Sequence, residues 1–321
     1  MSLIPAETPV QISEENLKNS VSTTNACKLC TPLGACLVFR GIEDAMPFLH
    51  GSQGCATYIR RYIISHFKEP MDIASSSFSE TTAIYGGKAN LQAGINNVTA
   101  QYHPSLIGVA TTCLSETIGD DIKGMIHEYR RESAKETPLL VPISTPSYTG
   151  THMDGFHAAV YGVVETLAEG GPKRTEQINL FPGLVSPADL RHLKEIVADF
   201  GLSPVLLPDY SATLDGPAID VYEKIPAGGT PITKIRQMGQ SAASIEFGQS
   251  LPQERSASHL LNERFEVKAD RLNLPIGIRG TDAFFAALTA ISGREVSDHH
   301  QQERGRLIDA YVDGHKYLFG K

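Results

Sequence analysis

The segment that decides the fold is Leu106-Ile107-Gly108-Val109-Ala110-Thr111-Thr112-Cys113. Its first five residues are a short apolar run typical of a buried β-strand, and small polar residues end it. We predict that an amphipathic helix over 118–131 follows, with Asp120 and Asp121 in its first turn, where carboxylates favour the helix dipole. Cys113 is therefore expected at the carboxyl end of a strand, which is where open α/β sheets place their ligands.

Strand-like and helix-like segments alternate from Ala45 onward, which indicates an α/β fold with a parallel sheet covered by helices. Further strands are expected over 139–143, 177–181, 205–207 and 275–278. Helices are expected over 153–167, 187–200, 234–238, 256–268, 282–292 and 301–317, with Ser186 as an N-cap and Gly201 following a helix end. The stretch 208–230, rich in Pro, Gly and Asp, is expected to be irregular, and near Ala243 we expect only a short apolar stretch.

The sequence Gly170-Gly171-Pro172 is typical of a linker. We therefore predict an N-terminal arm over residues 1–24, a first α/β domain over 25–170 and a second over 171–321. A length of 321 residues is enough for two domains that each bury a core.

Composition excludes several classes of protein. A hydrophobic share of 41% and a charged share of 20% are those of a soluble globular protein, and no apolar run approaches the roughly 20 residues that a bilayer requires. The first 20 residues resemble neither a secretory signal nor a transit peptide, so we expect a cytoplasmic protein. A net charge of −8 argues against a nucleic-acid binder, because phosphate neutralisation needs clustered Lys and Arg.

The five cysteines lack the density and regular spacing of a disulfide framework, so reduced thiols are expected. Cys30, Cys55 and Cys113 each lie in a turn rich in small residues. Iron-sulfur clusters need thiolate ligands, and small neighbours let backbone amides approach the sulfides. Taken singly, each cysteine could instead be a small buried hydrophobe. We assign Cys27 and Cys36 to that structural role, because one CxxC without a second pair does not make a four-ligand zinc site.

Four other polar residues attract attention. His50 and His66 could be ligands or proton carriers, although a histidine beside a Gly-rich turn is more often a structural hydrogen-bonding residue. Glu116 has a structural reason to lie at the start of a helix. The hydroxyl of Ser147 follows Pro146 in a turn, where it can bond the local backbone.

The three cysteine strings, with 60–70 and Ile118-Gly119-Asp120-Asp121, resemble the β-type chains of the nitrogenase component 1 superfamily. The resemblance runs from about Asn25 to the last residue. Two branches of that family are close. One is the β subunit of the molybdenum-iron nitrogenase, and the other is NifN, which pairs with NifE in the scaffold that matures the iron-molybdenum cofactor. The family fold implied is a set of Rossmann-like parallel-sheet domains, whose third member is absent here, so we expect a truncated chain that is not active alone.

The resemblance also implies the site. Cys30, Cys55 and Cys113 would ligate an iron-sulfur cluster shared with an α-type partner, and the nitrogenase iron protein would deliver electrons. In the catalytic branch the cluster is the P-cluster, Ser147 can bind one iron, and the partner is NifD. In the scaffold branch it is a four-iron cluster held from this side chiefly by Cys55, and the partner is NifE.

Keeping all three cysteines favours the catalytic branch, but four other strings look more like NifN, and we favour that branch. These strings are 27–32, 58–63, 151–156 and 313–317. A third alternative is a structural or docking module whose cysteines hold no cluster.

Overall fold

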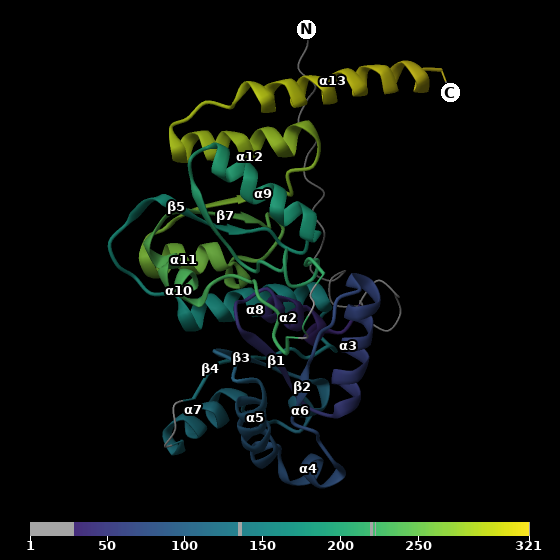
Figure 1. The fold of residues 1–321 in the computed structure, drawn as a ribbon, viewed down its shortest axis with the longest axis vertical. Helices are drawn as coiled ribbons and strands as arrows, with labels where there is room; N and C mark the ends of the chain where they lie inside the picture. The colour runs from purple at the N-terminus through teal and green to yellow at the C-terminus, as the bar shows by residue number, and fades with distance from the viewer. Residues whose placement is uncertain (1–28, 134–136, 219–220, 222, 321) are drawn as a thin grey trace.

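The computed structural model describes residues 29–133, 137–218, 221 and 223–320. It contains two parallel sheets of four strands each, with helices around them (Figure 1). This agrees with the α/β class predicted from the alternation of segments. Cys27 and the predicted N-terminal arm lie outside the described residues.

The first sheet has the strand order β2-β1-β3-β4. Every residue of β1 and β3 is buried, as expected for parallel strands covered on both faces. Helices α5 and α7 pack against one face through a separate apolar cluster that includes Phe48, Ile95 and Ile126. The elements are β1 (Ala45–His50), α3 (Gln53–Phe67), β2 (Ala74–Ser75), α4 (Glu80–Tyr85), α5 (Lys88–Tyr102), β3 (Leu106–Thr111), α6 (Cys113–Thr117), α7 (Ile122–Glu132) and β4 (Leu139–Ile143).

The second sheet repeats this pattern with the order β6-β5-β7-β8. The expected caps of α9 are confirmed, since the Ser186 hydroxyl accepts from the Asp189 amide at 3.1 Å and Gly201 has φ of +68°. The elements are β5 (Arg174–Phe181), α9 (Pro187–Asp199), β6 (Ser203–Leu206), α10 (Ile232–Arg236), the 3-10 turn η2 (Gln237–Gln240), β7 (Ser241–Phe247), the turn η3 (Gln253–Arg255), α11 (Ala257–Phe265) and β8 (Lys268–Leu272).

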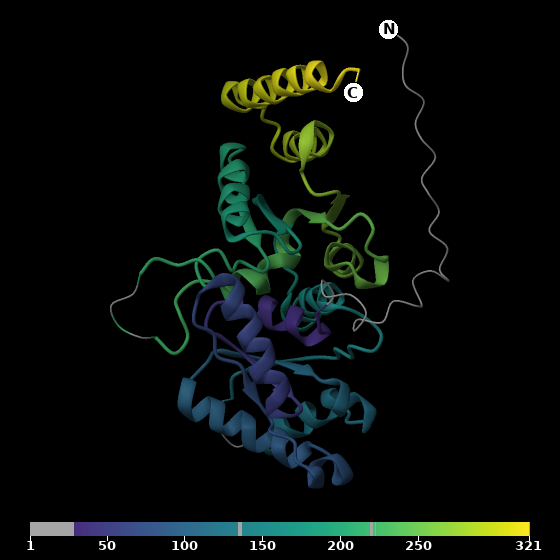
Figure 2. The same cartoon turned by 90° about the vertical axis from the view of Figure 1, so that its right-hand side faces the viewer.

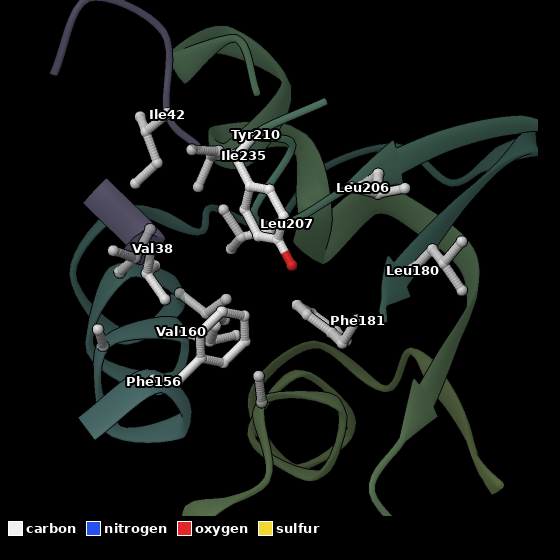
Figure 3. Packing of buried hydrophobic residues seen from close by; sticks show 14 of the residues in the cluster. Val38, Ile42, Phe156, Val160, Leu180, Phe181, Leu206, Leu207, Tyr210 and Ile235 are labelled. Atoms are coloured by element: carbon white, nitrogen blue, oxygen red, sulfur yellow. The ribbon is translucent and has the colours of Figure 1, made fainter. Parts of the chain in front are cut away.

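Helices α2 (Thr31–Arg40) and α8 (His152–Leu167) lie between the two sheets (Figure 1). One hydrophobic cluster runs from these helices into the second sheet, and Figure 3 shows Val38, Phe156 and Phe181 converging on Tyr210. The helices touch at glycines: a Cβ on Gly34 would lie 1.8 Å from the His152 carbonyl oxygen. Larger side chains at this crossing would therefore hold the helices apart.

Two helices, α12 (Gly277–Ser292) and α13 (Asp298–Leu318), lie at the far end of the second sheet (Figures 1 and 2). Within the described chain, His300 is the one buried residue of α13. Its ring lies 2.9 Å from the Asp199 carboxylate, which attaches the start of the helix to α9. None of the helices in the described ranges combines the length and the apolar character needed to cross a membrane.

Three predictions for the second half were wrong. The segment 275–278 is not a strand, because α12 begins at Gly277. The fourth strand is instead β8, which begins at Lys268, where the predicted helix was to end. Its Lys-Ala-Asp-Arg-Leu sequence has no apolar run, since an edge strand with one neighbour is only partly buried. Ala243 lies in a full seven-residue strand, β7, rather than in a short apolar stretch.

Candidate metal centre

The three cysteines predicted as ligands converge on one pocket of about 560 Å³. Each belongs to the start of a helix: Cys30 directly precedes α2, Cys55 lies in the first turn of α3, and Cys113 is the first residue of α6. Three separate segments therefore bring their sulfurs to one pocket at the starts of helices.

Strand order explains why Cys55 and Cys113 meet. In the order β2-β1-β3-β4, the chain passes from β1 to β2 on one side and then returns to place β3 on the other side of β1. The loops after β1 and β3 therefore leave in opposite directions, and a crevice forms between them at the carboxyl ends of the two strands. Those ends are in register, with His50 opposite Thr111. The following loops touch, since a Cβ on Gly51 would lie 2.1 Å from the Thr112 hydroxyl oxygen. The prediction that Cys113 lies at the end of a strand is thus confirmed.

Cys30 reaches the same pocket through contacts between α2 and the loop before α8. The Thr31 amide donates to the Ser147 hydroxyl at 3.1 Å, and the Thr31 hydroxyl donates to the Pro146 carbonyl at 3.3 Å. The Leu29 amide donates to Nδ1 of His152 at 3.3 Å, and the His152 amide donates back to the Leu29 carbonyl at 2.9 Å. These bonds place Ser147 in the wall of the pocket beside Cys30.

The thiols are close enough to influence one another. Burial raises the pKa of Cys30, a hydrogen bond with Ser147 opposes that rise, and the neighbouring Cys113 and Cys55 thiolates raise the pKa further. Deprotonated thiols this close repel one another, and a bound cation relieves that repulsion. Soft sulfur ligands in this arrangement suit a thiophilic metal such as iron.

The donor set fits a cluster better than one ion. In the part of the chain that the structure describes, no three His, Cys, Asp or Glu side chains are grouped so as to hold a single metal ion. The three thiols instead surround a volume of about 560 Å³ whose wall includes Ser52 and Gly54. Small wall residues leave room for sulfide and for backbone amides that bond to it. The residues present thus fit an iron-sulfur cluster.

One side of the pocket is open. Cys30 and Cys113 are exposed and Cys55 is half-buried. Large aromatic side chains stand around the opening, with Tyr58 62% and Tyr62 53% exposed. An exposed apolar rim of this kind is typical of a surface that another protein covers.

The remaining cysteines and histidines lie elsewhere. Cys36 is fully buried in α2, which agrees with the structural role assigned to it. His66 lies in the last turn of α3, packs edge-on against Phe67, and lines a neighbouring pocket of about 550 Å³ that it shares with His152. The structure therefore does not bring His66 into the cysteine pocket.

Glu116 lies in the first turn of α6 with the structural role expected of it, whereas Asp120 and Asp121 are not in the helical turn predicted for them. The helix expected over 118–131 begins at Ile122, because Gly119 has φ of +79° and breaks the chain's helical course. Asp121 is the N-cap and accepts from the Gly124 amide at 3.0 Å. Asp120 is not in a first turn but bonds the buried His50, a pairing that the sequence reasoning missed. Glu116 accepts hydroxyl hydrogen bonds from Thr111 and Ser144, which is a structural role.

The chain is similar to a known protein family and to several proteins of that family. The family model described as nitrogenase component 1 type oxidoreductase matches residues 30–321. The nitrogenase molybdenum-iron protein beta chain of Clostridium pasteurianum is 37% identical over 309 residues, which cover 96% of this chain and 67% of the relative. The iron-molybdenum cofactor biosynthesis protein NifN of Nostoc sp. is 34% identical over 307 residues, covering 95% of this chain and 68% of the relative.

A solved structure titled "Nitrogenase Cp1 at pH 6.5" superposes with a TM-score of 0.85 at 38% identity, covering 92% of this chain and 64% of that chain. A second, titled "Nitrogenase Cp1 at pH 5", has a TM-score of 0.60 at 16% identity and shares the fold. The chain therefore spans about two thirds of the length of the proteins it matches.

Proposed function

The chain belongs to the nitrogenase component 1 type oxidoreductase family, and we propose that within it the chain is a NifN-like subunit of the scaffold that matures the iron-molybdenum cofactor. Its part is to hold an iron-sulfur cluster at the boundary with an α-type partner. The observation that carries the cluster-holding part of the proposal is the pocket at the switch point of the first sheet, into which Cys30, Cys55 and Cys113 converge. The choice of the NifN branch rests on the sequence strings named above.

The residues have separable tasks in this proposal. The thiolates of Cys30, Cys55 and Cys113 would hold the cluster, and Ser147 would stand ready as an additional oxygen donor. When bound, the cluster supplies one-electron transfer. The chain itself supplies a hydrogen bond from Ser147 to Cys30 and apolar side chains that line the pocket.

The open side of the pocket supports the α-type partner, which we propose to be NifE. Tyr58, Tyr62 and Leu114 are exposed there and surround the thiols. A partner seated on them would bury the apolar rim and complete the ligands of the cluster. The nitrogenase iron protein is proposed as the electron donor. We place the complex in the cytoplasm, a setting in which the free thiols of the described cysteines persist.

A second candidate is the β subunit of the molybdenum-iron nitrogenase, with NifD as its partner and the P-cluster in the pocket. It is favoured by the convergence of all three cysteines with Ser147. The relatives carry both names at similar identity, 37% for a beta chain and 34% for NifN. The strings 58–63 and 151–156 support the NifN reading.

Iron content separates these candidates. The chain would be co-expressed anaerobically with its α-type neighbour, and iron, acid-labile sulfide and the EPR spectrum measured. Roughly four irons per pair of chains would support the scaffold, and roughly eight would establish the catalytic subunit instead. A colourless complex with background iron would leave only the structural or docking module.

Single Ala variants of Cys30, Cys55 and Cys113 sharpen the test. Loss of Cys55 should remove the cluster, whereas loss of either other thiol should do only mild damage in the scaffold. Equal and severe loss at all three positions would refute the NifN assignment. The matched control is Cys36→Ala, because Cys36 is buried in α2 away from the pocket and its removal should leave the iron content unchanged.

A further inference from the structure

His50 ends β1 and is fully buried, and its backbone and side chain bond different segments. Its carbonyl accepts from the amide of Thr112 at 3.2 Å and from the Thr112 hydroxyl at 3.1 Å. Thr112 directly precedes Cys113. Because His50 also begins the loop that leads to Cys55, these two bonds clamp both cysteine-bearing loops at one point.

The His50 side chain extends the clamp to Asp120. Its Nε2 lies 3.0 Å from Oδ2 of Asp120, whose side chain is 5% exposed. The ring also packs edge-on against Phe78, with centroids 4.8 Å apart. A carboxylate oxygen only accepts hydrogen bonds, so we assign the donated proton to Nε2. Nδ1 has no hydrogen-bond partner among the described residues. The orientation of the ring thus depends on Asp120.

Asp120 joins three segments. Both of its carboxylate oxygens accept from the Gly87 amide, at 3.2 and 3.1 Å, which holds the turn between α4 and α5. Its own amide donates to the Ser115 carbonyl at 3.1 Å, and Ser115 lies in α6, which begins at Cys113. A Cβ on Gly87 would lie 2.6 Å from Oδ2, so the close approach requires glycine there. The carboxylate therefore links β1 to the start of α5, and the backbone amide of the same residue bonds α6.

We propose that His50 and Asp120 are positioning residues that set the separation of the Cys55 and Cys113 thiols. Neither residue lines the cysteine pocket, so neither is assigned as a ligand. The pair acts through the loops: the bond between the two side chains fixes the positions of both residues, whose backbones in turn bond Thr112, through the His50 carbonyl, and Ser115 of α6, through the Asp120 amide. That the separation matters for a cluster rests on the function proposed above.

A test in the metal-free chain does not depend on that function. Cys27 and Cys30 are replaced by Ser, so that Cys55 and Cys113 are the pocket thiols left, and a short bismaleimide is used to join them. We expect His50→Leu and Asp120→Asn each to lower the rate of cross-linking roughly tenfold, a factor similar to the loss of metal affinity when the hydrogen-bond partners of metal ligands are removed. His50→Gln, whose amide can still donate to Asp120, should restore most of the rate.

The matched control is Glu246→Gln. Glu246 is likewise buried and likewise accepts hydrogen bonds at the start of a helix, but it belongs to the second sheet. The Glu246→Gln substitution should lower the midpoint temperature of unfolding while leaving the cross-linking rate at the parent value. Rates are compared only between variants that unfold cooperatively. If His50→Leu and Asp120→Asn cross-link as fast as Glu246→Gln, the pair is merely structural and the proposal is wrong.

The same variants in the complex give the second readout, the rate at which a chelator removes iron. If the parent complex holds iron, roughly tenfold faster loss and an altered EPR spectrum in His50→Leu support the proposal. If the parent holds none, the proposed function fails, but slower cross-linking in the variants still supports the positioning pair. Unchanged cross-linking overturns the pair in either case.

Discussion

Replacing Gly34 by Ala should destabilise the chain, because the missing side chain is what allows α2 to meet α8. A Cβ at this position would lie 1.8 Å from the carbonyl oxygen of His152 and 2.6 Å from the amide nitrogen of Phe156. Both are backbone atoms, so no rotamer change can relieve the contact. Ordinary contact begins at 3.4 Å, so the helices would have to separate by about 1.6 Å, the difference between 3.4 and 1.8 Å. Overpacking of buried sites costs about 1–3 kcal/mol, and we expect about 3 kcal/mol here.

The assay is urea unfolding followed by circular dichroism, with the free energy of unfolding extrapolated to water. The control is Gly305→Ala in the middle of α13, where no other atom lies within 4 Å of the added Cβ. That change should stabilise the chain by about 0.5–1 kcal/mol, because Ala favours a helix more than Gly does. If Gly34→Ala unfolds at the urea concentration of the parent chain or higher, the close crossing of α2 and α8 is wrong.

Three further predictions concern titration, a buried carboxylate and thiol access. Burial lowers the pKa of His50 and His157 in the folded chain. At acidic pH the unfolded chain therefore binds protons that the folded chain does not, so the free energy of unfolding should fall as the pH drops below the histidine pKa of the unfolded chain, about 6.5. A urea midpoint that stays constant between pH 7 and pH 5 would contradict this. Glu246→Gln should lower the free energy of unfolding by about 2 kcal/mol, because the carboxylate accepts from two serine hydroxyls and a helix amide, and calorimetry would detect the change. Cys36 should resist a thiol reagent that modifies Cys113 quickly, because burial raises the pKa of Cys36 and blocks access, and comparable rates by mass spectrometry would refute its placement in the core.

The sequence by itself determined the features that depend on neighbours in the chain. The run 106–110 lies within β3, 139–143 is β4 to the residue, and Ser186 caps α9 as predicted. Apolar runs, caps and breakers act over a few residues, so their effects can be read locally. The small residues around Cys55 and Cys113 identified them as ligand candidates for the same reason.

Only the tertiary structure decided the features that depend on distant segments. Residues 268–272 form a strand because β7 offers its edge, although their own sequence is too polar to predict one. Cys30 joins Cys55 and Cys113 because Gly34 of α2 and Gly155 of α8, where a Cβ would lie 1.8 Å from the Thr31 carbonyl oxygen, let the two helices cross closely. Asp120 bonds His50, 70 residues earlier, across the ends of two strands. The separation of such groups is set by packing and strand order, which no local pattern records.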